Sequence, residues 1–143
     1  MMPLLDTNVV SELMKADPDA GVLAWVDDLS RAELFVASIT QAELLYGVAL
    51  LPPGRRRDAI AQTIEAVFVE LFRDRILPFD SAAASAYADI GATRRRAGRP
   101  ISAFDAAIAA IARSRGATLA TRNLADFEGC GVDVIDPWTA NLR

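Results

Sequence analysis

The chain has 143 residues, of which 52% are hydrophobic and 24% charged, a composition typical of one globular domain with a sizeable core. It has no histidine and one cysteine, Cys130, which excludes zinc sites, an internal disulfide and catalysis that needs an imidazole. The net charge of −4 argues against binding nucleic acid through bulk positive charge. Because no apolar run approaches the roughly 20 residues that span a bilayer, and residues 1–6 lack the features of a secretion signal, we expect a cytoplasmic protein without membrane contact.

Short apolar runs alternate with segments of helical periodicity along the whole chain. This pattern predicts strands at residues 2–5, 33–38, 76–79, 117–120 and 132–135, and helices at 9–14, 21–29, 40–50, 55–73, 81–96 and 102–115. Strands that alternate with helices favour an α/β fold with a parallel sheet and helices on both faces. Since no linker, repeat or low-complexity segment interrupts the pattern, we predict a single domain over residues 1–143.

Acidic and amide side chains follow several of the predicted strands. Asp6 follows the first strand, Glu43 lies beyond the second, and Asn123 and Asp126 come after the fourth, while Asp105 opens a helix. Ligands of parallel sheets bind beyond the carboxyl ends of the strands, so a common site is one interpretation. Helix capping is the other, because the segments 40–43, 102–105 and 123–126 resemble capping boxes and Asp6 suits a turn or an N-cap.

The apolar neighbours of Asp6 and Asp105 favour a site over simple capping. A carboxylate among core-forming residues is costly to desolvate, and converging carboxylates raise one another's pKa, so a divalent cation would keep them ionised. Oxygen ligands select Mg²⁺ or Mn²⁺, and such an ion activates water and neutralises a phosphodiester. Either one or two ions are compatible with four acids.

Five segments together carry a family resemblance. They are Leu4-Leu5-Asp6-Thr7-Asn8-Val9, Thr40-Gln41-Ala42-Glu43-Leu44 with Gly47, residues 100–109 around Asp105, residues 121–127, and Asp136-Pro137-Trp138. In this order they resemble PIN-domain proteins of the VapC toxin type. The resemblance implies a PIN-like fold, a central parallel sheet of about five short strands flanked by helices on both faces, usually dimeric, with a magnesium-dependent ribonuclease site in which Mn²⁺ can substitute.

Carried over by position, the resemblance implies that Asp6 and Asp105 are the main metal ligands and that Glu43 completes the set. Relatives place the fourth acid either at the position of Asn123 or at that of Asp126, so Asp126 is assigned as catalytic and metal-binding and Asn123 is a candidate polar orienter. Two hydroxyls, those of Thr7 and Thr121, suit contacts with water or phosphate, and strand-end capping explains them equally well.

Three other features have both a structural and a functional interpretation. The arginine clusters Arg55–Arg57 and Arg94–Arg96 with Arg99 suit either solvated helix ends or phosphate and partner contacts, the second cluster more than the first. Most aromatic residues have core-type spacing, which argues against a base-stacking platform. The helix near residues 40–51 is apolar nearly all round, which predicts burial or an interface with a second copy or an antitoxin.

The sequence therefore predicts a magnesium-dependent endoribonuclease, the toxin of a type II toxin–antitoxin pair. Its expected partners are a cognate antitoxin, an RNA substrate and a second copy of the chain, with DNA contacted only through the antitoxin. The alternative from another class is a PIN-fold binding partner of a DNA-binding antitoxin that acts in operon repression with weak or no nuclease activity. A third is an α/β domain with capped helices and no metal. The RNA target cannot be derived from the sequence.

Overall fold

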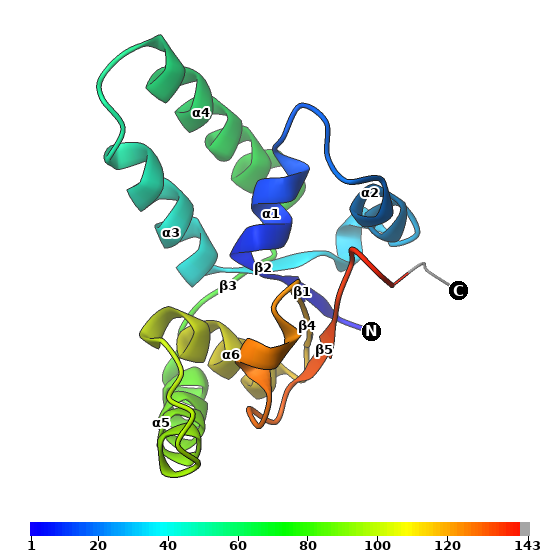
Figure 1. The fold of residues 1–143 in the computed structure, drawn as a ribbon. Helices are drawn as coiled ribbons and strands as arrows, with labels where there is room; N and C mark the ends of the chain where they lie inside the picture. The colour runs from blue at the N-terminus through cyan, green and yellow to red at the C-terminus, as the bar shows by residue number, and fades with distance from the viewer. Residues whose placement is uncertain (141–143) are drawn as a thin grey trace.

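The computed structural model describes residues 1–140, apart from the side chain of Arg31. Its centre is a five-stranded sheet of order β3-β2-β1-β4-β5, in which every neighbouring pair is parallel (Figure 1). The strands are β1 Pro3–Leu5, β2 Phe35–Ala37, β3 Ile76–Leu77, β4 Thr118–Ala120 and β5 Asp133–Ile135. The predicted five short strands and their parallel arrangement are confirmed.

Six α-helices surround the sheet within residues 1–140. They are α1 Thr7–Leu13, α2 Ala20–Asp27, α3 Ser38–Ala49, α4 Arg55–Ala66, α5 Ser81–Arg96 and α6 Ala103–Arg115. Short helical turns add η1 Arg31–Glu33, the wider π-turn η2 Val67–Leu71 and η3 Leu124–Phe127. Within residues 1–140 no helix is long and apolar enough to cross a membrane.

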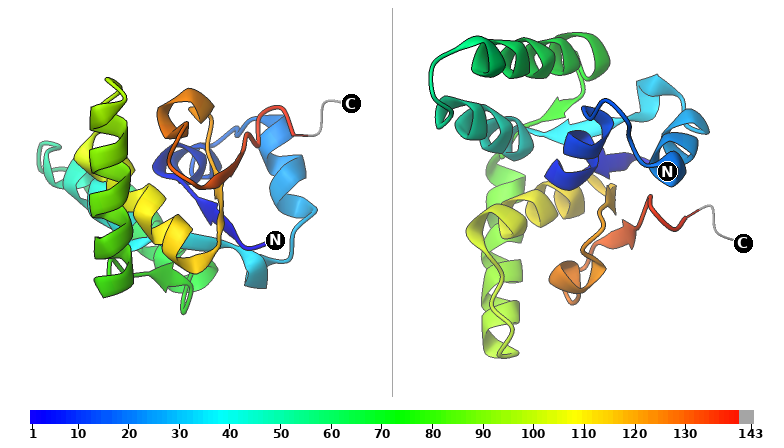
Figure 2. Two further views of the ribbon diagram at one scale, coloured as in Figure 1. Left: turned by 90° about the horizontal axis from the view of Figure 1, so that it is seen from below. Right: turned by 45° about the horizontal axis from the view of Figure 1, so that its top comes forward.

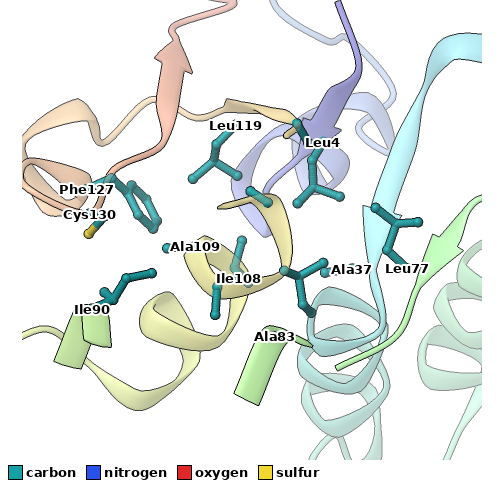
Figure 3. Close-up of a cluster of buried hydrophobic side chains, with 14 residues drawn as sticks. Leu4, Ala37, Leu77, Ala83, Ile90, Ile108, Ala109, Leu119, Phe127 and Cys130 are labelled. Carbon is teal, nitrogen blue, oxygen red and sulfur yellow. The ribbon is translucent and has the colours of Figure 1, made fainter. Parts of the chain in front are cut away.

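Successive residues of each strand point to opposite faces of the sheet and so build two cores. On β1, Leu4 packs with Ile108 of α6 and Ile90 of α5 in one core (Figure 3). Leu5 faces the other core, which contains Val9 of α1 and residues of α2, α4 and η2. Helices therefore cover both faces, as predicted; α1, α2 and α4 lie on one side and α5 and α6 on the other (Figures 1 and 2).

Some helix bounds differ from the prediction for local reasons. The first helix begins at Thr7, because Asp6 caps it directly after β1. The segment predicted as one helix over 55–73 is regular to Ala66 and then widens into η2. Neither η1 nor η3 is marked by apolar periodicity, since each is too short to show one.

Two alternatives left open by the sequence are decided by α3. The capping interpretation of Thr40 is wrong, because α3 begins at Ser38 and Ala37 occupies the N-cap position without a side-chain bond. Burial of the whole helix is also wrong: Leu45, Tyr46 and Leu50 are 50–67% exposed. An interface remains the interpretation that fits this apolar surface.

Candidate active site

The carboxyl ends of the strands and the first turns of three helices meet at one edge of the molecule. Helix α1 starts directly after β1, and α3 starts directly after β2. Helix α6 runs back along the sheet to deliver β4, so its first turn lies at the same edge (Figure 1). This edge is where α/β proteins place their ligands.

Asp6 is the most buried acid at this edge, with 5% of its surface exposed. Its Oδ1 accepts the backbone N–H of Val9 at 3.0 Å, and its carboxylate also accepts the hydroxyl of Thr121. Burial raises the pKa of Asp6 above its usual value, and the charge of Asp105 adds to the rise, while the hydrogen bonds from Thr121 and the first turn of α1 oppose it. Asp6 is thus the N-cap of α1, and its hydrogen bonds partly offset the cost of burying its charge.

Asp105 lies in the first turn of α6 and is half-buried. The predicted N-cap at Ser102 is confirmed, because its hydroxyl accepts the backbone N–H of Asp105 at 3.2 Å. Within residues 1–140 the Asp105 carboxylate accepts no hydrogen bond from the backbone N–H of Ser102, so it does not complete a capping box. Its charge raises the pKa of Asp6, as the smallest of the causes that act on that group, so the two carboxylates interact electrostatically.

Glu43 joins the site through a chain of hydroxyls. The Thr7 hydroxyl donates to Glu43 Oε1 at 2.9 Å, and Thr7 Oγ1 lies 3.1 Å from Thr40 Oγ1. Because the single proton of Thr7 goes to Glu43, Thr40 is the donor to Thr7. The first turn of α1, which Asp6 caps, is thereby tied to α3 and to the Glu43 carboxylate.

Thr121 connects Asp6 to the turn after β4. It is fully buried, and its Oγ1 accepts the backbone N–H of Asn123 at 3.1 Å. Asn123 precedes η3 without a side-chain cap, so the capping interpretation of residues 123–126 is wrong. Asp126 is exposed on η3, and within residues 1–140 its carboxylate has no hydrogen-bond or ion-pair partner.

The donor chemistry of the site fits a hard divalent cation in part. In the arrangement described for residues 1–140, no three acidic or cysteine side chains are gathered closely enough to hold a metal. The repulsion between Asp105 and the buried Asp6 is nevertheless the kind of strain that a bound cation relieves. Asp6, Asp105 and Glu43 are the acids of this edge whose carboxylate oxygens would suit such an ion.

Part of the second arginine cluster is structural rather than available for phosphate. Arg94 is buried and donates to the carbonyls of Arg99, Asp126 and Glu128 at 2.7–3.0 Å. Arg99 forms an ion pair of 2.7 Å with Glu128. These contacts fix η3, and with it the candidate Asp126, against the end of α5.

Two residues near this edge, Thr40 and Arg94, make contacts that the sequence analysis did not predict. Thr40 was interpreted only as a cap, although its spacing to Glu43 puts both side chains on one helix face, which was the available signal. Arg94 had no such signal, because it stands in a run of three arginines. The expectation that the aromatic residues are mostly core holds for Trp25, Phe68 and Phe72, whereas Phe79 and Phe104 are 40% and 55% exposed.

Comparison with known proteins places this fold in one family. A family model described as the PIN domain matches residues 4–128. The chain is 43% identical to VapC ribonuclease Y4jK of Sinorhizobium fredii (strain NBRC 101917 / NGR234), over 96% of this chain and 98% of the relative. It is 41% identical to toxin FitB of Neisseria gonorrhoeae (strain ATCC 700825 / FA 1090), over 96% and 99%.

Solved structures agree with these relatives. FitAB bound to an IR36 DNA fragment superposes with a TM-score of 0.88 at 40% identity, covering 96% of both chains. A member of the VapBC family of toxin–antitoxin systems from Mycobacterium tuberculosis superposes with a TM-score of 0.70 at 26% identity, over 94% of this chain and 98% of that one.

The chain belongs to the PIN domain family, as its sequence resemblance implied. Within that family it is a nuclease of the VapC and FitB toxin type.

Proposed function

We propose that this chain is the toxin of a toxin–antitoxin pair and cleaves RNA phosphodiesters at the carboxyl edge of its sheet with the help of Mg²⁺, for which Mn²⁺ can substitute. The observation that carries the proposal is the pairing of a buried Asp6 with Asp105 at that edge in a PIN-domain chain. Asp6, Glu43 and Asp105 would hold the ion, and Asp126 would be the fourth acid. The ion, when bound, supplies charge neutralisation at the phosphodiester and a lower pKa for water.

The chain's own residues orient this site. Thr121 and the first turn of α1 fix the Asp6 carboxylate, and the hydroxyls of Thr40 and Thr7 direct Glu43. The chain has no histidine, and the carboxylates at this edge are the groups placed to accept a proton from the attacking water. We further propose that residues 1–143 act as one domain and that it works in the cytoplasm, where its RNA lies.

The test is cleavage of total RNA by the purified chain with Mg²⁺, with EDTA and with the Asp6→Asn variant. We expect cleavage with Mg²⁺ alone and its loss in the other two reactions. Asp74→Asn is the matched control, because Asp74 is an exposed acid before β3, at the opposite ends of the strands. Cleavage that persists in EDTA or in Asp6→Asn would refute the metal-dependent mechanism at this edge.

A cognate antitoxin is part of the proposal, and the superposed structure from the VapBC family of toxin–antitoxin systems supports it. The structure of FitAB bound to DNA also favours a second function, in which the complex with the antitoxin acts on DNA while the nuclease is weak or silent. RNA that stays intact with the partner-free chain, together with Mg²⁺ binding, would select this second function.

We propose that two copies of the chain pair through the exposed apolar surface of α3. Leu45 and Tyr46 on this helix and Leu50 at its C-cap are at least half exposed, and a patch of this kind becomes self-complementary around a two-fold axis. Sedimentation should give a dimer for the wild-type chain and a monomer for Tyr46→Glu. Val69→Glu, which alters an exposed apolar residue on η2, should leave the dimer intact.

A further inference from the structure

A polar pocket adjoins the candidate active site and has no part in the proposed metal chemistry. It measures about 310 Å³ and is lined by Asn8, Ser11, Glu12, Lys15, Arg122 and Trp138. Asn8 follows Thr7, which bonds to Glu43, and Arg122 follows Thr121, which bonds to Asp6. Two lining residues of the pocket are therefore direct chain neighbours of residues that contact the acids of the candidate site.

Within residues 1–140, the guanidinium of Arg122 stacks on an aromatic ring and donates no hydrogen bond. Its guanidinium carbon lies 4.9 Å from the centroid of the Trp138 ring, and the residue is exposed. Within residues 1–140 no carboxylate or carbonyl accepts a hydrogen bond from it, in contrast to the side chains of Arg94 and Arg99. Stacking on an indole restrains the guanidinium plane while leaving its N–H edges open, a preorganised state for a bidentate anion.

A buried acid organises a second cation beside Arg122. Glu12 is 8% exposed, and Lys15 Nζ lies 2.9 Å from its Oε1. The hydrogen bond from Lys15, the backbone N–H of Asp19 and the charges of Lys15 and Arg122 lower the pKa of Glu12, so it stays ionised. Glu12 therefore offsets one of the two cations, and the side chains that line the pocket carry a net positive charge in a chain whose net charge is −4.

We propose that this pocket binds a backbone phosphate of the RNA strand next to the cleaved bond, with Arg122 as its main ligand, Lys15 as a second cation and Trp138 as the residue that positions Arg122. The two parallel N–H groups of a guanidinium match two phosphate oxygens. Positive charge in the pocket also offsets the repulsion between RNA and the acidic side chains of the candidate site. The inference rests on the proposed ribonuclease function and assigns to it a substrate-binding subsite.

The test measures substrate binding separately from chemistry. With a short fluorescein-labelled single-stranded oligoribonucleotide, kcat and KM are compared for wild type, Arg122→Gln and Trp138→Leu in Mg²⁺. We expect KM to rise about fivefold or more in both variants with kcat nearly unchanged, since Asp6 and Asp105 are intact. In EDTA, the slope of log affinity against log salt should fall by about 0.7 for Arg122→Gln, the loss of one phosphate contact.

Arg73→Gln is the matched control, because Arg73 is exposed before β3, at the opposite ends of the strands, and its loss changes the net charge equally. Arg122→Lys should recover part of the affinity, since the charge returns without the fork. The proposal is wrong if Arg122→Gln matches Arg73→Gln in both KM and salt slope while wild type cleaves the RNA. Failure of wild type to cleave any RNA with Mg²⁺ would instead refute the proposed function on which the pocket rests.

Discussion

Two regions of the molecule use charged side chains in opposite ways. Around η3, the buried Arg94 donates to three backbone carbonyls, and Arg99 pairs with Glu128. At the carboxyl edge of β1, Asp6 is equally buried, yet the charge that reaches it from Asp105 is of the same sign. The first region satisfies its charges to hold the chain together, whereas the second retains an unfavourable charge.

This difference separates charges that stabilise the fold from charges that point to a function. A buried charge with a full set of partners needs no ligand to explain it. A buried carboxylate beside another carboxylate lowers the stability of the folded chain and persists where a cation or a reaction requires it. Four predictions test the contrast, from the largest expected effect to the smallest.

Asp105→Asn should abolish the function of the edge without harming the fold. We expect the rate of RNA cleavage in Mg²⁺ to fall by more than about a hundredfold, because a direct ligand contributes at least as much as the outer groups that orient it. The Asp89→Asn variant should cleave at the wild-type rate, because Asp89 is an exposed acid on α5 that forms an ion pair with Arg113 of α6. Equal rates for the two variants would show that Asp105 does not take part in catalysis.

Arg94→Met should be the most destabilising change in the η3 region. It leaves the carbonyls of Arg99, Asp126 and Glu128 without their donor, which should reduce the free energy of unfolding by about 3 kcal/mol. Arg95→Met, one residue along the same helix but exposed, should change it by no more than about 0.5 kcal/mol. Urea denaturation of both variants checks the pair; similar midpoints would mean that the carbonyls find other donors.

The sequence predicted the sheet well because its signal is repetitive. Each strand is a short apolar run whose alternate residues meet one of two cores, as Leu4 and Leu5 do. Proline and glycine marked the ends of the elements, for example Gly116, which adopts φ 64° after α6. These features depend on local residue types, so a single sequence is enough to read them.

The details that decide the site depend on non-local geometry, and the sequence alone could not resolve them. Thr40 and Ser102 begin the same capping pattern, yet only Ser102 is an N-cap, because β2 leads into α3 at Ser38 without a turn. Arg94 and Arg95 are chemically identical, and only the phase of α5 against η3 buries the first of them. The electrostatic pairing of Asp6 with Asp105 likewise needs the fold, since the two acids lie far apart along the chain.

Thr40→Val should weaken the hydroxyl chain that directs Glu43. The variant keeps the shape of the side chain but loses the donor to Thr7, which should reduce the free energy of unfolding by about 1 kcal/mol. We also expect slower RNA cleavage, because Glu43 loses part of its orientation. Thr63→Val removes an exposed hydroxyl that bonds only to Ala59 within α4, so it serves as the control for the loss of a hydroxyl. Unchanged cleavage in Thr40→Val would exclude an orienting role for this chain.

Asp6→Asn should change how the free energy of unfolding depends on pH in the absence of metal, because the variant lacks the buried charge of Asp6. The pKa of Asp6 is higher in the folded chain than its ordinary value of 3.8. The contribution of Asp6 to the free energy of unfolding is therefore most favourable below pH 3.8, where the group is protonated in both states, and it is lost as the pH rises through the pKa of the folded chain. The stability of the wild type relative to Asp6→Asn should therefore decline as pH rises from acid to neutral, because an amide can still cap α1 and carries no charge.

Mg²⁺ should reverse this difference at neutral pH, since an ion that binds only the folded wild type stabilises it by mass action. Thermal denaturation of both chains at several pH values, with EDTA and with Mg²⁺, measures the effect, and Asp74→Asn controls for the loss of one acid. A stability gap that stays constant with pH would mean that Asp6 is not strained by its burial. The contrast between the two regions would then lie in the fold alone and not in a charge kept for the reaction.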